Sequence, residues 1–118
     1  MLQDHSICQE NYHRFLKRVE QSGQVWGLHS TKGWANCPSN EHDGRDVLLF
    51  WSDRAYAARQ ITEGWTSYSP EVISLEAFLE KWLPGMQKDQ VLVGPNWDAH
   101  LCGLEIEPQE VAQRLTAP

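Results

Sequence analysis

Residues 73–85 read Ile-Ser-Leu-Glu-Ala-Phe-Leu-Glu-Lys-Trp-Leu-Pro-Gly and contain a complete helix signal. Ser74 is a suitable N-cap, because its hydroxyl accepts a hydrogen bond from a backbone N–H of the first turn. The apolar side chains that follow are Leu75, Phe78, Leu79 and Trp82. Their spacing places them on one helix face, and Pro84-Gly85 is expected to end the helix. The pattern predicts an amphipathic helix that packs its apolar face on a sheet.

The sheet is predicted from apolar segments that precede this helix. Residues 47–51 form an uninterrupted apolar run, which is typical of a strand covered on both faces. Residues 25–28 and 34–37 flank a Ser-Thr-Lys-Gly turn and predict a β-hairpin. Residues 38–46 are turn-forming and polar, so they predict a loop before the apolar strand.

Three further helices are predicted. The first begins near Ser6, which has capping-box spacing to Gln9, and it ends at Gly23. Its apolar stripe is Ile7, Cys8, Tyr12, Phe15, Leu16 and Val19. The second starts at Ser52-Asp53 and ends at Gly64, and its inward residues are Ala55, Tyr56, Ala58 and Ile61. The last opens at Pro108, with Val111, Ala112 and Leu115 directed inward.

The remaining segments complete the expected order of elements. Residues 65–68 predict a short strand or an extended connector, and residues 91–93 and 101–106 predict a terminal strand pair. This order favours an α+β fold, a largely antiparallel sheet with helices packed on it. A chain of 118 residues without a repeat or a boundary is expected to form a single domain over residues 1–118.

An ordered set of segments runs through most of the chain. They are Val25-Trp26 with Leu28, Gly33-Trp34-Ala35, Phe50-Trp51-Ser52, residues 73–84, and Val91-Leu92-Val93. On these residues the chain resembles a small bacterial family, domain-of-unknown-function family 2750 (DUF2750), over residues 12–115. The resemblance implies a fold, but no activity, ligand or catalytic residue.

A weaker similarity is to SseB-type domains. It rests on the hairpin, the polar loop and the apolar strand that ends in Leu49-Phe50-Trp51-Ser52 before an Ala-rich helix. The proline that is usual in that run is missing here. The similarity implies an accessory or interaction module.

The chain contains 6 tryptophans, and three of them fall near predicted turns: Trp34, Trp65 and Trp97. An exposed indole in such a place is a common anchor of a protein interface, so these three are candidate binding residues. The alternative is that they cap the ends of the core, since tryptophan is highly but rarely fully buried.

The charge distribution is uneven. Residues 1–60 carry seven Lys/Arg and seven Asp/Glu, whereas residues 61–118 carry three and nine, so the second half contributes the net −6. Nucleic acids and anionic membranes attract clustered basic residues, so neither is an expected partner of the second half. Glu76 and Glu80 are expected on the outer face of the third helix, where they would bind a basic protein or simply be solvated.

Candidate metal ligands and nucleophiles lack a recognisable signature. Cys37 and His42 lie near each other in sequence, and Asp98, His100 and Cys102 alternate along a predicted strand. Zinc sites need four convergent ligands, and no CxxC pair is present, so no metal is expected. A cysteine or serine paired with His29, His42 or His100 lacks a nucleophile motif. No phosphate-binding loop or dinucleotide motif passes through the glycines, so no cofactor is expected.

These observations favour a small cytoplasmic binding or regulatory module, of an accessory or immunity type. The cytoplasm is expected because the N-terminus lacks a signal-peptide pattern and the 3 cysteines do not form a disulfide framework. No apolar stretch approaches the ~18 residues of a membrane span. The alternatives are an enzyme with a His/Cys-containing cleft and a structural subunit of a homo-oligomer.

Overall fold

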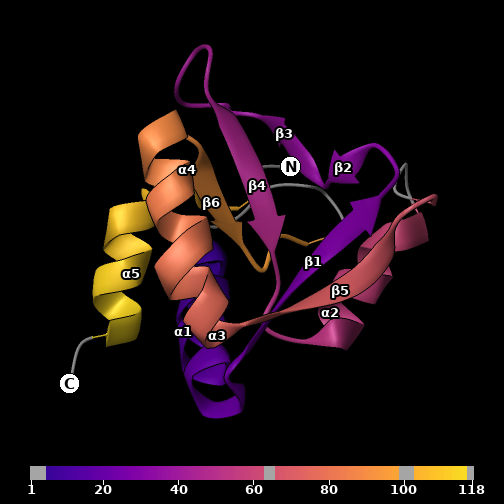
Figure 1. The fold of residues 1–118 in the computed structure, drawn as a ribbon, viewed down its shortest axis with the longest axis horizontal. Helices are drawn as coiled ribbons and strands as arrows, with labels where there is room; N and C mark the ends of the chain where they lie inside the picture. The colour runs from indigo at the N-terminus through magenta and orange to yellow at the C-terminus, as the bar shows by residue number, and fades with distance from the viewer. Residues whose placement is uncertain (1–4, 63–65, 99–102, 117–118) are drawn as a thin grey trace.

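Helices pack against two three-stranded sheets in the computed structural model, which describes residues 5–62, 66–98 and 103–116 (Figure 1). The first sheet has the order β2-β1-β5, formed by β1 (Gln24–Ser30), β2 (Gly33–Trp34) and β5 (Ser69–Ser74). The second has the order β3-β4-β6, formed by β3 (Asn36–Pro38), β4 (Asp46–Phe50) and β6 (Leu92–Pro95). The helical segments are α1 (His5–Ser22), α2 (Arg54–Ala58), η1 (Arg59–Thr62), α3 (Leu75–Ala77), η2 (Phe78–Trp82), α4 (Leu83–Asp89) and α5 (Pro108–Thr116).

The α+β class and the mostly antiparallel pairing are confirmed, but the expectation of one sheet is wrong. The second strand of the predicted hairpin bends at Ala35, where it passes from β2 to β3. The N–H of Ala35 donates to the Leu28 carbonyl at 2.8 Å, while its own carbonyl accepts from the Leu49 N–H at 3.1 Å. The segment therefore contributes one short strand to each sheet.

The pairing of β4 with β6 is parallel, which was not expected. The helical segments between residues 75 and 89 lie between these strands in the chain and provide the crossover that a parallel pair needs. Because parallel strands end at the same edge of a sheet, the residues after β4 and β6 meet there. This edge forms the floor of the pocket described below.

Strand β5 was missed, since the predicted strand or connector was placed at residues 65–68. The strand lies farther along and pairs with β1 from Ser69 to Ser74. It contains Pro70, and Val72 is 50% exposed, so the segment lacks the apolar character of a central strand. An edge strand of this kind gives little sequence signal. Trp65 lies outside the described residues.

Helix α1 buries the predicted stripe through Cys8, Tyr12, Phe15 and Val19. Ile7 is the exception, because it is 47% exposed and lies one residue to the side of that stripe. Gly23 ends the helix as predicted: its φ is 70°, and its N–H donates to the Val19 carbonyl at 2.8 Å.

The second predicted helix is shorter and less regular than expected. Only α2 is α-helical, and η1 continues it as a 3₁₀ helix, whose tighter turn changes the side-chain periodicity. As a result Ala57 and Gln60 are buried, while Ala55 is exposed. The predicted end at Gly64 lies outside the described residues.

The helix after β5 starts as predicted but does not end at Pro84-Gly85. The Ser74 hydroxyl accepts a hydrogen bond from the Ala77 N–H at 3.1 Å, which confirms the cap. The next turn is a π-helix, in which the Leu83 N–H donates to the Phe78 carbonyl. A wider turn directly before proline lets the chain continue where an α-helix would be disrupted. The helix ends at Gln90, which has a φ of 59°.

Aromatic rings hold the main core together. Phe78 makes edge-to-face contacts with Phe50 at 5.0 Å and with Phe15 at 6.4 Å between ring centroids. Helix α5 covers this core through Val111 and Leu115, as predicted for a helix opened by Pro108. The predicted strand at residues 101–106 shows one backbone bridge, from Ile106 to Val93, and residues 99–102 lie outside the described part.

Candidate functional site

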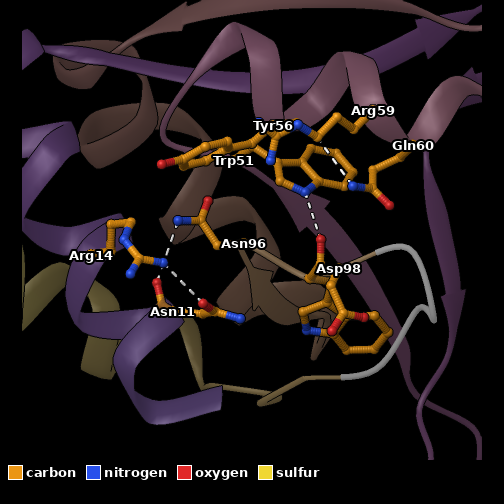
Figure 2. Close-up of a pocket in the computed structure, with 9 residues that line it drawn as sticks. Asn11, Arg14, Trp51, Tyr56, Arg59, Gln60, Asn96 and Asp98 are labelled. Carbon is orange, nitrogen blue, oxygen red and sulfur yellow. Dashed lines mark hydrogen bonds between the residues drawn. The ribbon is translucent and has the colours of Figure 1, made fainter. Parts of the chain in front are cut away.

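A pocket of about 240 Å³ lies where α1 and α2 meet the ends of β4 and β6 (Figure 2). Helix α1 contributes Asn11 and Arg14. The α2–η1 segment contributes Tyr56, Arg59 and Gln60. The segments after β4 and β6 contribute Trp51, Asn96, Trp97 and Asp98. We call this hollow the α1–α2 pocket.

The indole side chains of Trp51 and Trp97 form the floor of the pocket, and the N–H group of each donates a hydrogen bond to a backbone carbonyl. Trp51 Nε1 donates to the Trp97 carbonyl at 2.9 Å, and Trp97 Nε1 donates to the Leu104 carbonyl at 2.8 Å. Both side chains are almost completely buried. A Cβ atom at Gly94 would lie 2.9 Å from the Trp97 ring, so the absence of a side chain there makes room for this indole.

Asn96 links the floor to the walls. It follows β6 with a φ of 50°, a left-handed conformation that asparagine adopts more readily than most residues. Its Oδ1 accepts from the Ser52 N–H at 2.9 Å, and its Nδ2 donates to Ser52 Oγ at 3.1 Å and to the Asn11 carbonyl at 3.4 Å. These bonds satisfy the buried amide and join β6, β4 and α1.

The polar side chains at the pocket wall make fewer hydrogen bonds than their donors and acceptors allow. Arg14 Nη1 donates to Asn11 Oδ1 at 3.1 Å, and Arg14 forms no salt bridge among the described residues. The Arg59 guanidinium lies 5.5 Å from the centroid of the Tyr56 ring, a cation–π contact. Gln60 Nε2 donates to the Tyr56 carbonyl at 3.2 Å, whereas the buried Gln60 Oε1 accepts no hydrogen bond from any residue that the structure describes. The wall therefore combines a guanidinium with donors to spare and an acceptor that no described residue uses.

A second hollow of about 450 Å³ adjoins the pocket and shares Arg14 and Tyr56 with it. We call it the α1 groove; its other lining residues are His13, Lys17, Arg18 and Gln21. The four side chains Arg14, Lys17, Arg18 and Gln21 are spaced i, i+3, i+4, i+7 on α1 and so form one stripe. The groove is a basic surface on a chain whose net charge is −6.

Arg18 connects the groove to the start of α2. Its Nε and Nη2 donate to the two carboxylate oxygens of Asp53 at 2.6 and 2.5 Å. These bonds, together with one from the Ser52 hydroxyl, hold the pKa of Asp53 below its usual value against the opposing effect of burial. Asp53 occupies the N-cap position of α2, where the helix was predicted to start, but its side chain makes no cap hydrogen bond and binds Arg18 instead. Arg18 therefore positions α1 against α2.

The predicted tryptophan anchors are not brought together at this pocket. Trp97 is 2% exposed and forms part of the floor, so it lacks the open surface that an interface anchor needs. Trp34 is half-buried, and its ring lies 4.9 Å from Trp82 and 4.5 Å from His29. Trp65 lies outside the described residues.

Glu76 and Glu80 are both exposed on the helix after β5, while Phe78 is buried. This agrees with the expected outer-face position. That a basic partner binds these carboxylates stays a prediction.

The candidate metal and nucleophile residues give no cluster in the described part of the chain. No group of three or more His, Cys, Asp or Glu side chains suited to a metal ion is found there. Cys37 is a free, half-buried thiol, and burial, followed by the charges of Glu105 and Asp46, raises its pKa. A raised pKa disfavours the thiolate that a nucleophile or metal ligand requires. His100 and Cys102 lie outside the described residues.

The pocket residues Arg14, Tyr56, Arg59, Gln60 and Asn96 were missed at the sequence level. A signal was available for Arg14, because Arg14, Lys17 and Arg18 share one face of a predicted helix. The total charge of residues 1–60 does not reveal this stripe, because the seven acidic residues of that half balance its seven basic residues. Gln60 and Asn96 gave no comparable signal, because their importance depends on burial.

Among the helices that the structure describes, none combines the length and the apolar character of a membrane span.

The comparisons with known proteins identify a family but no individual relative. No curated protein and no solved structure matches the chain. The family described as "Protein of unknown function (DUF2750)" matches residues 12–115, which is most of the chain. The chain therefore belongs to the DUF2750 family, as the resemblance implied.

Proposed function

We propose that the protein is a binding module that recognises an acidic segment of a partner protein in the α1–α2 pocket and the α1 groove. The observation that carries the proposal is the position of Arg14. Its side chain lines both hollows and forms no salt bridge among the described residues, although its charge contributes to lowering the pKa of Asp53. A guanidinium has five N–H donors in a planar fork that matches a carboxylate, so it suits an anion at the junction of the two hollows.

The groove supports a protein segment as the partner. His13 and Lys17 extend the positive surface along α1 beyond the pocket. A chain with several acidic side chains would contact Arg14 and Lys17 at the same time, while a lone small anion would use only one of them. The attraction would also speed association at low salt, since opposite charges steer the encounter.

The composition of the pocket supports binding. Arg14, Asn11 and Gln60 supply hydrogen-bonding groups, and Tyr56 and the two indoles supply flat apolar surface. This combination orients a ligand through a few polar contacts in an otherwise aromatic site. The proposed setting is a regulatory or accessory role in a bacterial cytoplasm. The free thiol of Cys37 supports it, because thiols stay reduced in that compartment.

The experiment compares acidic peptides on matched arginine variants. Pentapeptides of Glu and Asp, labelled at the N-terminus, are titrated with protein and followed by fluorescence anisotropy. Arg14→Gln is expected to weaken binding by about tenfold or more, since a charge-assisted contact is worth about 1.5 kcal/mol or more. Arg54→Gln removes the same charge from an exposed residue that lines neither hollow and is expected to have little effect.

Two results would contradict the proposal. If none of the acidic peptides binds, the pocket and groove do not form an acidic-segment site. If both variants lose affinity equally, the attraction is diffuse and the position of Arg14 is irrelevant. Added salt is expected to weaken the wild-type complex whether Arg14 acts specifically or the attraction is diffuse, so salt dependence alone does not distinguish these two results.

A further inference from the structure

A hollow of about 400 Å³ lies between α4 and α5, two helices that Figure 1 shows side by side. We call it the α4–α5 slot, and its lining residues are Leu79, Leu83, Pro84, Gln87, Pro108, Gln109 and Ala112. Gln87 Nε2 donates to Gln109 Oε1 at 3.1 Å, so this amide pair joins the two helices. Apart from these two glutamines the lining is apolar.

The π-helical turn beside the slot leaves one backbone carbonyl without a helical donor. In an α-helix the Leu79 carbonyl would accept from the Leu83 N–H, but that N–H donates to the Phe78 carbonyl. In a π-helix its donor would be residue 84, which is proline and has no N–H. Because helix carbonyls point towards the C-terminal end, this one lies between Leu79 and Pro84, which both line the slot. The slot therefore contains an acceptor that its own helix does not satisfy.

Carboxylates lie at the same end of the slot as this carbonyl. Glu76 precedes Leu79 by three residues and Glu80 follows it directly, so both lie within about one helical turn of it. Both side chains are exposed, and neither forms a salt bridge among the described residues. Lys81 lines a different hollow, and Lys88 lies near the glutamine pair. The negative charge is therefore concentrated at the Leu79 end.

These features define the chemistry of an occupant. A groove between two helices accepts the apolar face of a third helix. The N–H groups of a helix are used internally except in its first turn, so the donor for the Leu79 carbonyl has to come from a side chain. Lysine and arginine carry such donors on long stems, and their positive charge suits the neighbouring carboxylates. An acidic partner would instead meet Glu76 and Glu80 as like charges.

We propose that the α4–α5 slot is a second binding surface, which takes the apolar face of a basic amphipathic helix from a partner protein. Aliphatic side chains of that helix fill the slot against Leu83 and Ala112. A lysine or arginine one turn away donates to the Leu79 carbonyl and lies close to Glu76 and Glu80. The surface goes beyond the proposed function, because the slot shares no residue with the α1–α2 pocket and selects a partner of the opposite charge.

Peptide binding to the full chain tests this surface. The probe is acetyl-Lys-Leu-Ala-Lys-Lys-Leu-Ala-Lys-Leu-Ala-Lys-amide, whose leucines share one face when it is helical. One matched peptide has the same composition with the leucines spread around the helix, and another has glutamine in place of every lysine. Calorimetric titration is expected to show binding of the probe and a loss of about fivefold or more for each matched peptide.

Ala112→Leu tests the slot itself. The larger side chain fills the space from the α5 side, so the probe is expected to bind more weakly by about tenfold. Leucine is a good helix former and Ala112 is only half-buried, so the melting temperature should be unchanged or higher. The matched control is Gln113→Leu, at an exposed position of α5 that does not line the slot. It should bind the probe as the wild type does.

Pro84→Ala tests the carbonyl. Alanine supplies the N–H that the Leu79 carbonyl lacks, so the probe should lose about threefold to fivefold in affinity, without a loss of stability. Pro108→Ala removes the same ring from the slot, but its new N–H lies in the first turn of α5, where an N–H has no helical acceptor. It is expected to weaken binding less than Pro84→Ala does.

A pair of double variants tests the carboxylates. Glu76→Gln with Glu80→Gln is expected to weaken binding of the probe by about fivefold. Glu20→Gln with Glu41→Gln removes the same charge at exposed positions elsewhere and should have a smaller effect. Equal losses would mean that the basic probe is attracted by the net charge alone, which overturns the inference.

Other results would overturn it as well. If the probe does not bind, or if Ala112→Leu and Gln113→Leu bind it alike, the slot is not a docking surface. If the glutamine peptide binds as tightly as the probe, the slot does not select a basic partner. If Pro84→Ala and Pro108→Ala have the same effect, the Leu79 carbonyl makes no contact. A dimer in sedimentation equilibrium that Ala112→Leu converts to a monomer would show that a second copy of the chain covers the slot.

Discussion

Trp82 illustrates how a single residue joins two parts of the fold. Its ring makes edge-to-face contacts with Trp34 at 4.9 Å and with Phe50 at 5.7 Å between centroids. Trp82→Ala is expected to lower the free energy of unfolding by about 3 kcal/mol, since it removes a large side chain that packs on the core. Urea unfolding measures the change, with exposed Lys81→Ala as a control within about 0.5 kcal/mol. A loss below about 1 kcal/mol for Trp82→Ala would show that this face does not belong to the core.

The Arg18–Asp53 pair predicts a pH dependence of stability. The pKa of Asp53 is lowered in the folded protein, first of all by its hydrogen bonds to Arg18. The pair therefore stabilises the fold above the unfolded value of about 3.9, and this contribution is lost as the pH falls through the lower folded pKa. Asp53→Asn is expected to lower the melting temperature at about pH 6, and the difference from the wild type should shrink towards about pH 2.

The control for this prediction is Asp43→Asn, which removes an exposed loop carboxylate that forms no salt bridge among the described residues. Thermal unfolding of the three proteins at both pH values gives the comparison. A constant difference between Asp53→Asn and the wild type at all pH values would mean that the carboxylate charge is not responsible.

At the scale of elements, two helices end in a left-handed residue but use different amino acids. Gly23 follows α1 with a φ of 70°, and Gln90 follows α4 with a φ of 59°. Glycine adopts this conformation without a steric penalty, whereas glutamine does not. Gln90→Gly is therefore expected to raise the free energy of unfolding by about 0.5–1 kcal/mol.

Gly23→Ala should have the opposite effect and lower the free energy of unfolding by about 1 kcal/mol. A Cβ atom at Gly23 would meet nothing within 4 Å, so the expected loss comes from the backbone conformation alone. Urea denaturation of both variants gives the signs. A destabilised Gln90→Gly would show that the side chain of Gln90 contributes more than its backbone strain removes.

At the scale of the whole molecule, β4 connects the two hydrophobic clusters. Phe50 belongs to the cluster under α1 and α5, while its neighbours Leu49 and Trp51 belong to the cluster with Leu28 and Trp97. Because one strand supplies both, the clusters are expected to unfold together, in line with the single domain expected for residues 1–118. Far-ultraviolet circular dichroism and tryptophan fluorescence should give one coincident urea transition. Two separate transitions would contradict this expectation.

The acidic second half predicts a partner surface distinct from the basic groove. Glu76 and Glu80 are exposed, and a basic protein that binds them should associate more slowly as salt is added. The double change Glu76→Lys and Glu80→Lys should slow association of a co-purifying basic protein and leave the circular dichroism spectrum unchanged. Glu20→Lys with Glu41→Lys, at exposed positions elsewhere, controls for net charge. If binding is unchanged by the Glu76 and Glu80 changes and by salt, these carboxylates are only solvated.

The features that could be predicted before the structure depend on interactions between neighbours in the chain. Ser74 caps its helix, Gly23 ends α1, and four of the five residues of the apolar run 47–51 are buried, all but Leu48. Capping, turn conformation and apolar periodicity are local properties. The class α+β and membership of the DUF2750 family follow from the same local patterns.

The features that could not be predicted depend on contacts between residues far apart in the chain. The parallel pairing of β4 and β6 places Trp51 beside Asn96 and Trp97, and α1 brings Arg14 to the same edge. Trp97 is buried in the floor of the α1–α2 pocket and is not exposed as an interface anchor would be, because burial depends on the elements that pack on a residue. The burial of Gln60 has the same cause, since it depends on the elements that pack around this residue and not on its residue type.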